Sequence, residues 1–85
     1  MVVVRGVQRM HDHAETYRKL ALNIAYYRRQ ANLSQLQLAE KAGISRAYLS
    51  AIEAPNLTKP FNSDTLFDIA RALDVELSRL FDFSK

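Results

Sequence analysis

Apolar residues recur through the first half of the chain at the spacing of an α-helix. Over residues 16–31 they fall three or four positions apart, at Leu20, Ile24, Tyr27 and Ala31. This spacing places them on one face of a helix. Asn32 follows, and asparagine tolerates the left-handed backbone region better than most residues. The pattern predicts a helix over residues 16–31 that turns one face toward a core.

A second, shorter helix is predicted over residues 35–42. Ser34 can accept a hydrogen bond from a backbone N–H of its first turn, and Gln37 stands at the reciprocal position of a capping box. Gly43 follows the last helical residue, where a left-handed conformation costs least for a residue without Cβ. We therefore expect this helix to end in a tight turn.

A third helix is predicted over residues 46–53, directly after that turn. Ser45 can cap it, and Leu49 and Ile52 give it an apolar edge. The positions left on its outer face are small, polar or basic: Arg46, Ala47, Ser50 and Ala51. A helix that presents such a face after a short turn fits the major groove of DNA.

Two further helices complete an all-α arrangement. A residue before proline is pushed out of the helical region, so Ala54-Pro55 ends the third helix and begins a loop. Asn62 or Ser63 then caps a fourth helix. Its inner stripe is Leu66, Ile69, Ala70 and Leu73, and a short fifth helix carries Leu77, Leu80 and Phe81. The pattern predicts a compact five-helix bundle over residues 16–83.

Residues 1–15 lack a sustained apolar period. Three valines and a glycine are followed by Arg9, His11 and His13 among other polar residues. We therefore expect a flexible or loosely docked N-terminal arm in front of the domain formed by residues 16–83.

The composition argues against several classes of protein. The chain of 85 residues allows one small domain, and without cysteine it forms neither disulfides nor thiolate metal sites. The two histidines, His11 and His13, stand two positions apart and cannot share one face of a helix. No glycine-rich phosphate loop and no serine with an activating histidine is present. We expect no metal, no cofactor and no enzymatic activity, and the lack of a long apolar run predicts a soluble cytoplasmic protein without a membrane partner.

Charge is distributed unevenly along the chain, whose formal net charge is +3. Residues 1–59 carry nine Lys or Arg and four Asp or Glu, whereas residues 60–85 carry three and five. A basic front of this kind favours contact with a polyphosphate such as DNA. Because simple solvation accounts equally well for so modest a difference, the charge supports DNA binding only together with the helical pattern.

Taken together, these segments resemble the helix-turn-helix of the phage repressor and Cro family, also called the XRE family of bacterial transcriptional regulators. The resemblance extends over residues 17–81 and is carried by the helix pair of residues 34–53. It also includes the stretches LALNIAYYRRQANLS, YLSAIE and TLFDIARALDVELSRLF. It implies a lambda-repressor-like bundle that binds double-stranded DNA, with the third helix as the recognition helix.

Each residue on the outer face of that helix has more than one possible role. Arg46 either bonds guanine O6 and N7 together or contacts a phosphate. Ala47 and Ala51 either pack on a thymine methyl or simply leave room for the approach. Ser45 and Ser50 are candidates for phosphate or base contacts through their hydroxyls.

Other residues would position the recognition helix on the DNA backbone. Tyr48 either bonds a phosphate through its phenol or packs against the neighbouring loop. By the family resemblance, Gln35 bonds a phosphate and braces the recognition helix. Arg28 and Glu53 match a family pair that bridges the first helix to the end of the third, and Arg28 could also touch phosphate. The loop after the third helix resembles a segment that contacts the DNA backbone, which makes candidates of Asn56, Thr58 and Lys59.

Three features depart from the family pattern. Ala54-Pro55 replaces the usual glycine turn after the third helix, and Asp74 stands where glycine is usual. Leu22 and Tyr26 fall at positions of the first helix that are usually charged, where they form an apolar stripe outside the core. Our hypothesis is that the N-terminal arm or a partner subunit covers this stripe.

Apolar residues near the C-terminus favour self-association. By resemblance to related repressors they are candidates for the two-fold contact of a homodimer: Phe67, Leu77, Leu80, Phe81 and Phe83. The alternative is that most of them close the core of the monomer. A two-fold dimer would bind half-sites about 34 Å apart on a palindromic operator.

Two functions follow from these observations. The first is a sequence-specific DNA-binding regulator, acting as a repressor or an autoregulator. The second is a protein-interaction module of the same fold, such as an antitoxin, in which DNA contact is secondary or lost. Arg46, Gln35 and the basic front distinguish them, because only the first function needs these residues to meet DNA.

Overall fold

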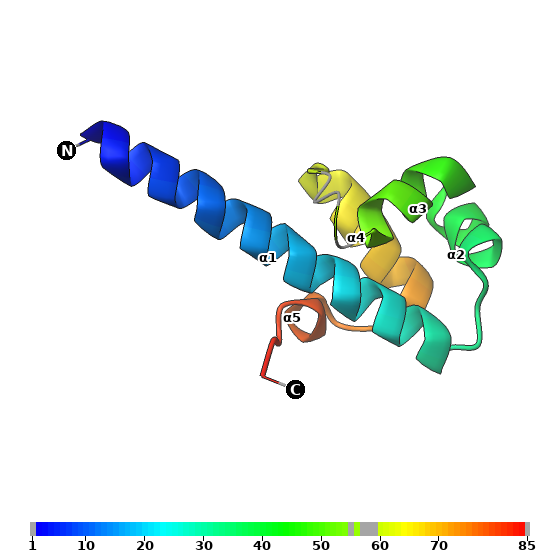
Figure 1. The fold of residues 1–85 in the computed structure, drawn as a ribbon. Coiled ribbons are helices and arrows are strands. Elements are labelled where there is room, and N and C mark those ends of the chain that lie inside the picture. The colour runs from blue at the N-terminus through cyan, green and yellow to red at the C-terminus, as the bar shows by residue number, and fades with distance from the viewer. Residues whose placement is uncertain (1, 55, 57–59, 85) are drawn as a thin grey trace.

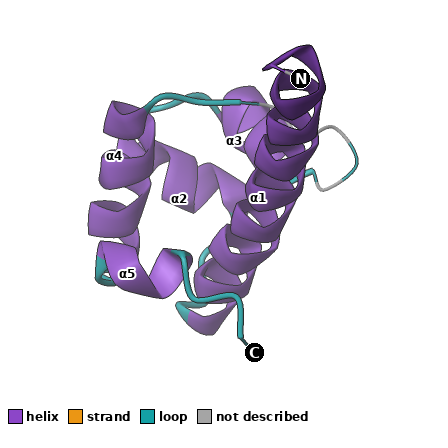
Figure 2. Cartoon of the chain, turned by 90° about the vertical axis from the view of Figure 1, so that its left-hand side faces the viewer, coloured by secondary structure: helices purple, strands orange, loops and turns teal. Residues whose placement is uncertain are grey.

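Five α-helices form the fold in a computed structural model that describes residues 2–54, 56 and 60–84 (Figure 1). In chain order they are α1 (Val2–Gln30), α2 (Gln35–Ala42), α3 (Arg46–Glu53), α4 (Ser63–Leu73) and α5 (Leu77–Leu80). In Figure 2, α1 lies on one side of the bundle and α4 on the other, with α2 and α3 between them. The described ranges contain no strand, and the predicted all-α class is confirmed.

Helix α1 is longer than the sequence pattern predicts. It begins at Val2 rather than near Thr16, so the predicted start of the first helix is wrong. That residues 1–15 form a flexible or loosely docked arm stays a prediction. The N-terminal half of α1 projects beyond the bundle (Figure 1). Packing holds the later turns of α1, and each residue added before them gains a hydrogen bond without a new nucleation cost. A helix can therefore extend into a segment whose sequence has no apolar pattern that predicts a helix.

The predicted caps define the bounds of α2 and α3. The Ser34 hydroxyl accepts a hydrogen bond from the backbone N–H of Gln37 at 3.0 Å, and the Gln37 side-chain oxygen accepts one from the N–H of Ser34 at 2.8 Å. Gly43 ends α2 with φ of 75°, and Ser45 caps α3 by accepting from the N–H of Tyr48 at 3.0 Å. The capping box and the glycine turn are both confirmed.

A side-chain cap also begins α4, and a residue with left-handed backbone conformation ends it. Of the two predicted caps, Asn62 is the one that acts: its Oδ1 accepts from the N–H of Thr65 at 2.9 Å. Asp74 follows α4 in the left-handed region with φ of 57°, and its N–H bonds back to carbonyls of the last turn. Aspartate tolerates this conformation better than most residues, so the junction keeps the shape that glycine would give it.

All five helices contribute to one core. The fully buried large side chains are Ile24 of α1, Leu38 of α2, Leu49 and Ile52 of α3, Ile69 of α4 and Leu80 of α5. Asn23 fastens the C-terminal end to α1, because its side-chain amide donates to the carbonyls of Leu80 at 2.9 Å and Asp82 at 3.1 Å. In the described part of the chain, no helix combines the length and the apolar character needed to cross a membrane.

The turn at Gly43 provides a test of how much the backbone conformation contributes to stability. A Cβ at this position would meet no atom within 4 Å, so Gly43→Ala adds only the strain of a positive φ. We expect the free energy of unfolding to fall by about 1 kcal/mol, measured by urea denaturation. Gly43→Asn is the control and should cost less, because asparagine enters the left-handed region more readily. Equal losses for the two variants would contradict this assignment.

Candidate nucleic-acid interface

Helix α3 presents one flank to the core and another to the surroundings. Leu49, Ile52 and Glu53 are buried, whereas Arg46 and Ala47 at the start of the helix are exposed. Ser50 and Ala51 on the same outer side are half-buried. The helix lies at the periphery of the bundle (Figure 1), so its first turn is open to another molecule.

Two residues at the start of α3 have structural roles that limit what they can offer a ligand. The Ser45 hydroxyl oxygen already accepts the cap hydrogen bond, which leaves its proton to donate. Tyr48 is half-buried and packs against the core, and its packing against the neighbouring loop stays a prediction. Contact of Tyr48 with a phosphate stays a prediction.

A buried ion pair joins the end of α3 to α1. Arg28 donates to both oxygens of the Glu53 carboxylate, from Nε at 2.9 Å and from Nη2 at 3.1 Å. The side chains are 12% and 4% exposed respectively, and this paired geometry is the strongest that arginine forms with a carboxylate. Arg28 also donates from Nη1 to the carbonyl of Leu33 at 2.9 Å, in the connection before α2. The predicted pair is therefore present and is extended by a backbone acceptor.

Gln35 of α2 is the third member of the group that it forms with Arg28 and Glu53, which we call the Glu53 cluster. Its Nε2 donates to Oε1 of Glu53 at 3.0 Å, so the predicted brace on the recognition helix takes the form of a direct hydrogen bond. Glu53 thus receives hydrogen bonds from two helices, α1 and α2. No signal in the sequence pairs Gln35 with Glu53, which lie eighteen positions apart. The contact of Gln35 with a phosphate stays a prediction.

The loop after α3 is described only in part. Asn56 is an exposed turn residue. The predictions for Thr58 and Lys59 lie outside the described residues.

The structure divides the candidate dimer residues into three groups. Leu80 is fully buried in the monomer, so its assignment to an interface is wrong: it closes the core, as the alternative held. Leu77 and Phe83 are half-buried against that core. Phe67 and Phe81 are exposed, and they stay the accessible candidates.

The apolar stripe on α1 is open in the monomer. Leu22 is 47% exposed and Tyr26 is 43% exposed. The segment expected to cover them continues along the axis of the same helix (Figure 1), so coverage by the N-terminal arm is wrong. A residue of a continuous helix cannot fold back onto that helix.

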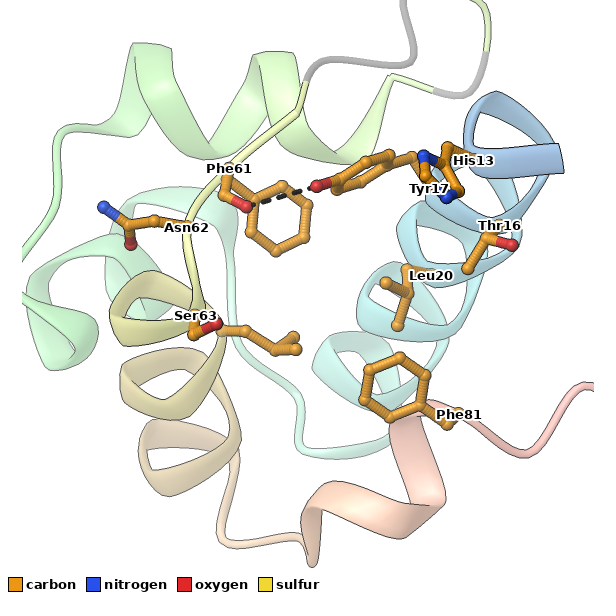
Figure 3. Close-up of a pocket in the computed structure, with 9 residues that line it drawn as sticks. His13, Thr16, Tyr17, Leu20, Phe61, Asn62, Ser63 and Phe81 are labelled. Carbon is orange, nitrogen blue, oxygen red and sulfur yellow. Dashed lines mark hydrogen bonds between the residues drawn. The ribbon is translucent and has the colours of Figure 1, made fainter. Parts of the chain in front are cut away.

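A hollow of about 310 Å³ lies apart from the flank of α3, between α1, the start of α4 and the C-terminal end (Figure 3). Phe61 and Phe81 lie at opposite ends of it, with Leu20 between them. The Tyr17 hydroxyl donates to the carbonyl of Phe61 at 3.4 Å, and their rings meet edge to face at 5.4 Å.

The described residues include no group of three His, Asp or Glu that could hold a metal ion.

The Glu53 cluster provides a test of how firmly α3 is held. Removing one partner of a buried pair strands the other charge, so Glu53→Ala should lower the free energy of unfolding by about 3–5 kcal/mol in urea titrations. Gln35→Ala should lower the free energy of unfolding by only about 1 kcal/mol, because Arg28 still donates hydrogen bonds to both oxygens of the Glu53 carboxylate. As a control, Asp68→Ala removes an exposed ion pair with Arg71 and should cost less than about 0.5 kcal/mol. A loss for Glu53→Ala as small as for Asp68→Ala would refute the role assigned to the cluster.

Comparison with known proteins agrees with this architecture. Residues 24–80 match a helix-turn-helix family. The chain is 39% identical over 59 residues to the HTH-type transcriptional regulator SinR of Bacillus subtilis, covering 69% of this chain and 52% of SinR. It is 38% identical over 61 residues to the control protein C.SmaI of Serratia marcescens, covering 72% of this chain and 70% of C.SmaI.

A solved structure extends the likeness to three dimensions. The restriction-modification controller protein C.AhdI from Aeromonas hydrophila superposes with a TM-score of 0.71 and 28% sequence identity, covering 76% of this chain and 96% of C.AhdI. This chain spans about half the length of SinR. The capped helix pair and the exposed start of α3 are the features of a helix-turn-helix, and residues 24–80 match that family. The chain therefore belongs to the XRE-type helix-turn-helix family of transcriptional regulators.

Proposed function

We propose that this protein is a DNA-binding transcriptional regulator that reads the major groove with α3. The observation that carries the proposal is the arrangement of α3 itself. Arg46 and Ala47 are exposed at its start, while Glu53 at its end is held by Arg28 and Gln35. A helix fixed at one end and open at the other is suited to insertion into a groove. The relatives' descriptions as a transcriptional regulator and a control protein support the same function.

The contacts fall into two kinds. Arg46 carries most of the base readout through a bidentate bond to guanine, and Ala47 and Ala51 allow the close approach that this bond needs. The remaining candidates contact phosphates and set the register without reading sequence: Arg28, Gln35, Ser45, Tyr48, Ser50, Asn56, Thr58 and Lys59. The N–H groups at the start of α2 favour an anion there, because they lie at the positive end of the helix.

The regulator acts on a palindromic operator as a homodimer, in the role of a repressor or an autoregulator. A single recognition helix reads too few bases for useful selectivity, and two-fold symmetry doubles the site. Phe67 and Phe81 are the interface candidates, because both are exposed, Phe67 on α4 and Phe81 directly after α5. The half-sites would lie about 34 Å apart.

Arg46→Ala tests the readout. The operator is first selected with the wild-type protein from a pool of random duplexes, whose symmetry also reports the oligomeric state. On that duplex the variant should bind about ten- to a hundred-fold more weakly, measured by fluorescence anisotropy, with little change on a scrambled duplex. Arg71→Ala is the matched control, because it removes an exposed arginine from the last turn of α4.

Lys59→Ala tests the backbone contacts. We expect affinity to fall about equally for the operator and the scrambled duplex, and the dependence of affinity on salt to become shallower by about one counterion. If neither Arg46→Ala nor Lys59→Ala changes affinity for any duplex, the protein-interaction function replaces the one proposed.

A further inference from the structure

One asparagine of α1 holds the chain that follows α5. The side-chain amide of Asn23 donates to the carbonyl of Leu80 at 2.9 Å and to the carbonyl of Asp82 at 3.1 Å. These two carbonyls stand on either side of Phe81 in the chain. Carbonyls at and beyond the end of a helix have no partner within it, so they need donors from elsewhere. Asn23 supplies both donors from a single planar group.

Two further contacts hold the residues next to Phe81. Leu80 is fully buried in the core, and the ring centroid of Phe83 lies 5.6 Å from the ammonium nitrogen of Lys19 on α1. The rings of Phe81 and Phe83 are 6.4 Å apart. Lys19 stands four residues before Asn23, so the two α1 side chains that reach this stretch lie on one face of the helix. The backbone around Phe81 is therefore fixed on both sides, although it follows the last helix.

The side chain of Phe81 stays accessible despite these restraints. It is 44% exposed, and its ring stands at one end of the hollow beside α1 (Figure 3). A large aromatic side chain in such a position can act as an anchor of a protein interface. When its backbone is already ordered, less conformational freedom is lost on binding, which raises affinity without a new contact. The two hydrogen bonds of Asn23 thus prepare Phe81 for a partner.

We propose that Asn23 is a positioning residue for self-association: it orders the chain on both sides of Phe81, which contacts a second copy of the chain. This inference rests on the proposed function, in which Phe81 is an interface candidate. Asn23 acts from within one copy, because its amide faces carbonyls of its own chain. An aspartate of nearly the same size would lose both donors and would set a carboxylate against two carbonyl oxygens.

Sedimentation equilibrium without DNA tests this role. Asn23→Asp should weaken self-association about ten-fold, because it releases the segment around Phe81. Phe81→Ala should weaken it at least as much, since it removes the anchor itself. Gln30→Glu is the matched control: it adds a negative charge at an exposed position of α1, about 10 Å along the helix from Asn23, and should leave the dissociation constant unchanged. An Asn23→Asp variant that associates as strongly as the wild type overturns the proposal.

A double variant separates positioning from a general loss of stability. If Asn23 acts through Phe81, then Asn23→Asp should have no further effect on self-association once Phe81→Ala has removed the ring. Losses that multiply in the double variant overturn the proposal. Urea denaturation establishes that each variant is folded at the concentrations compared. Should Asn23→Asp unfold the domain, Asn23→Ala takes its place in the same cycle, because it removes the donors without adding a charge.

A duplex with a single half-site distinguishes this inference from the proposed function. One copy binds such a duplex, so Asn23→Asp should bind it as the wild type does and lose affinity only for the full operator. If the wild type binds no duplex while the self-association results hold, the reading of DNA by α3 fails and the role of Asn23 stands. If the wild type stays monomeric at every concentration, the role of Asn23 is refuted, and the reading of DNA is still decided by Arg46→Ala.

Discussion

The arrangement of the whole domain depends on one buried carboxylate. The side chain of Glu53 is 4% exposed, and a carboxylate at such a position requires partners that compensate for the water it has lost. Arg28 and Gln35 supply three donors between them. These donors come from α1 and α2, so Glu53 can be satisfied only when three helices meet in one geometry. The end of α3 is thereby positioned by hydrogen-bond directions and not by apolar packing alone.

The two ends of α3 differ in a way that suits recognition. At its end, the Glu53 cluster fixes the tilt of the helix. At its start, Ser45 uses its own hydroxyl to cap the first turn, so no other element needs to cover Arg46 or Ala47. Leu49 and Ile52 anchor the helix between these ends. A probe of DNA must be rigid and yet uncovered, and this division of the helix meets both conditions.

How much the sequence predicts depends on whether the signal is local. The bounds of α2 and α3 follow from Ser34, Gly43 and Ser45, since capping and left-handed turns are decided within one helical turn. Tertiary contacts are different. Leu80, which the sequence leaves open between a dimer contact and the core, is the most deeply buried residue of α5. The bond from Gln35 to Glu53 joins two helices whose approach no periodicity encodes. The length of α1 escapes prediction because a helix grown from a packed segment needs no core-facing pattern of its own.

Helix α1 links the functions assigned to the domain. Its inner stripe, with Ile24 at the centre, builds the core; Arg28 reaches the end of α3; and Leu22 and Tyr26 face outward. Arg28 stands four residues from Ile24, about 6 Å along the same helix axis. A helix is stiff over this distance, so the packing of Ile24 in the core also fixes the place from which Arg28 reaches Glu53. The Arg28–Glu53 pair therefore ties the direction of α3 to that of α1.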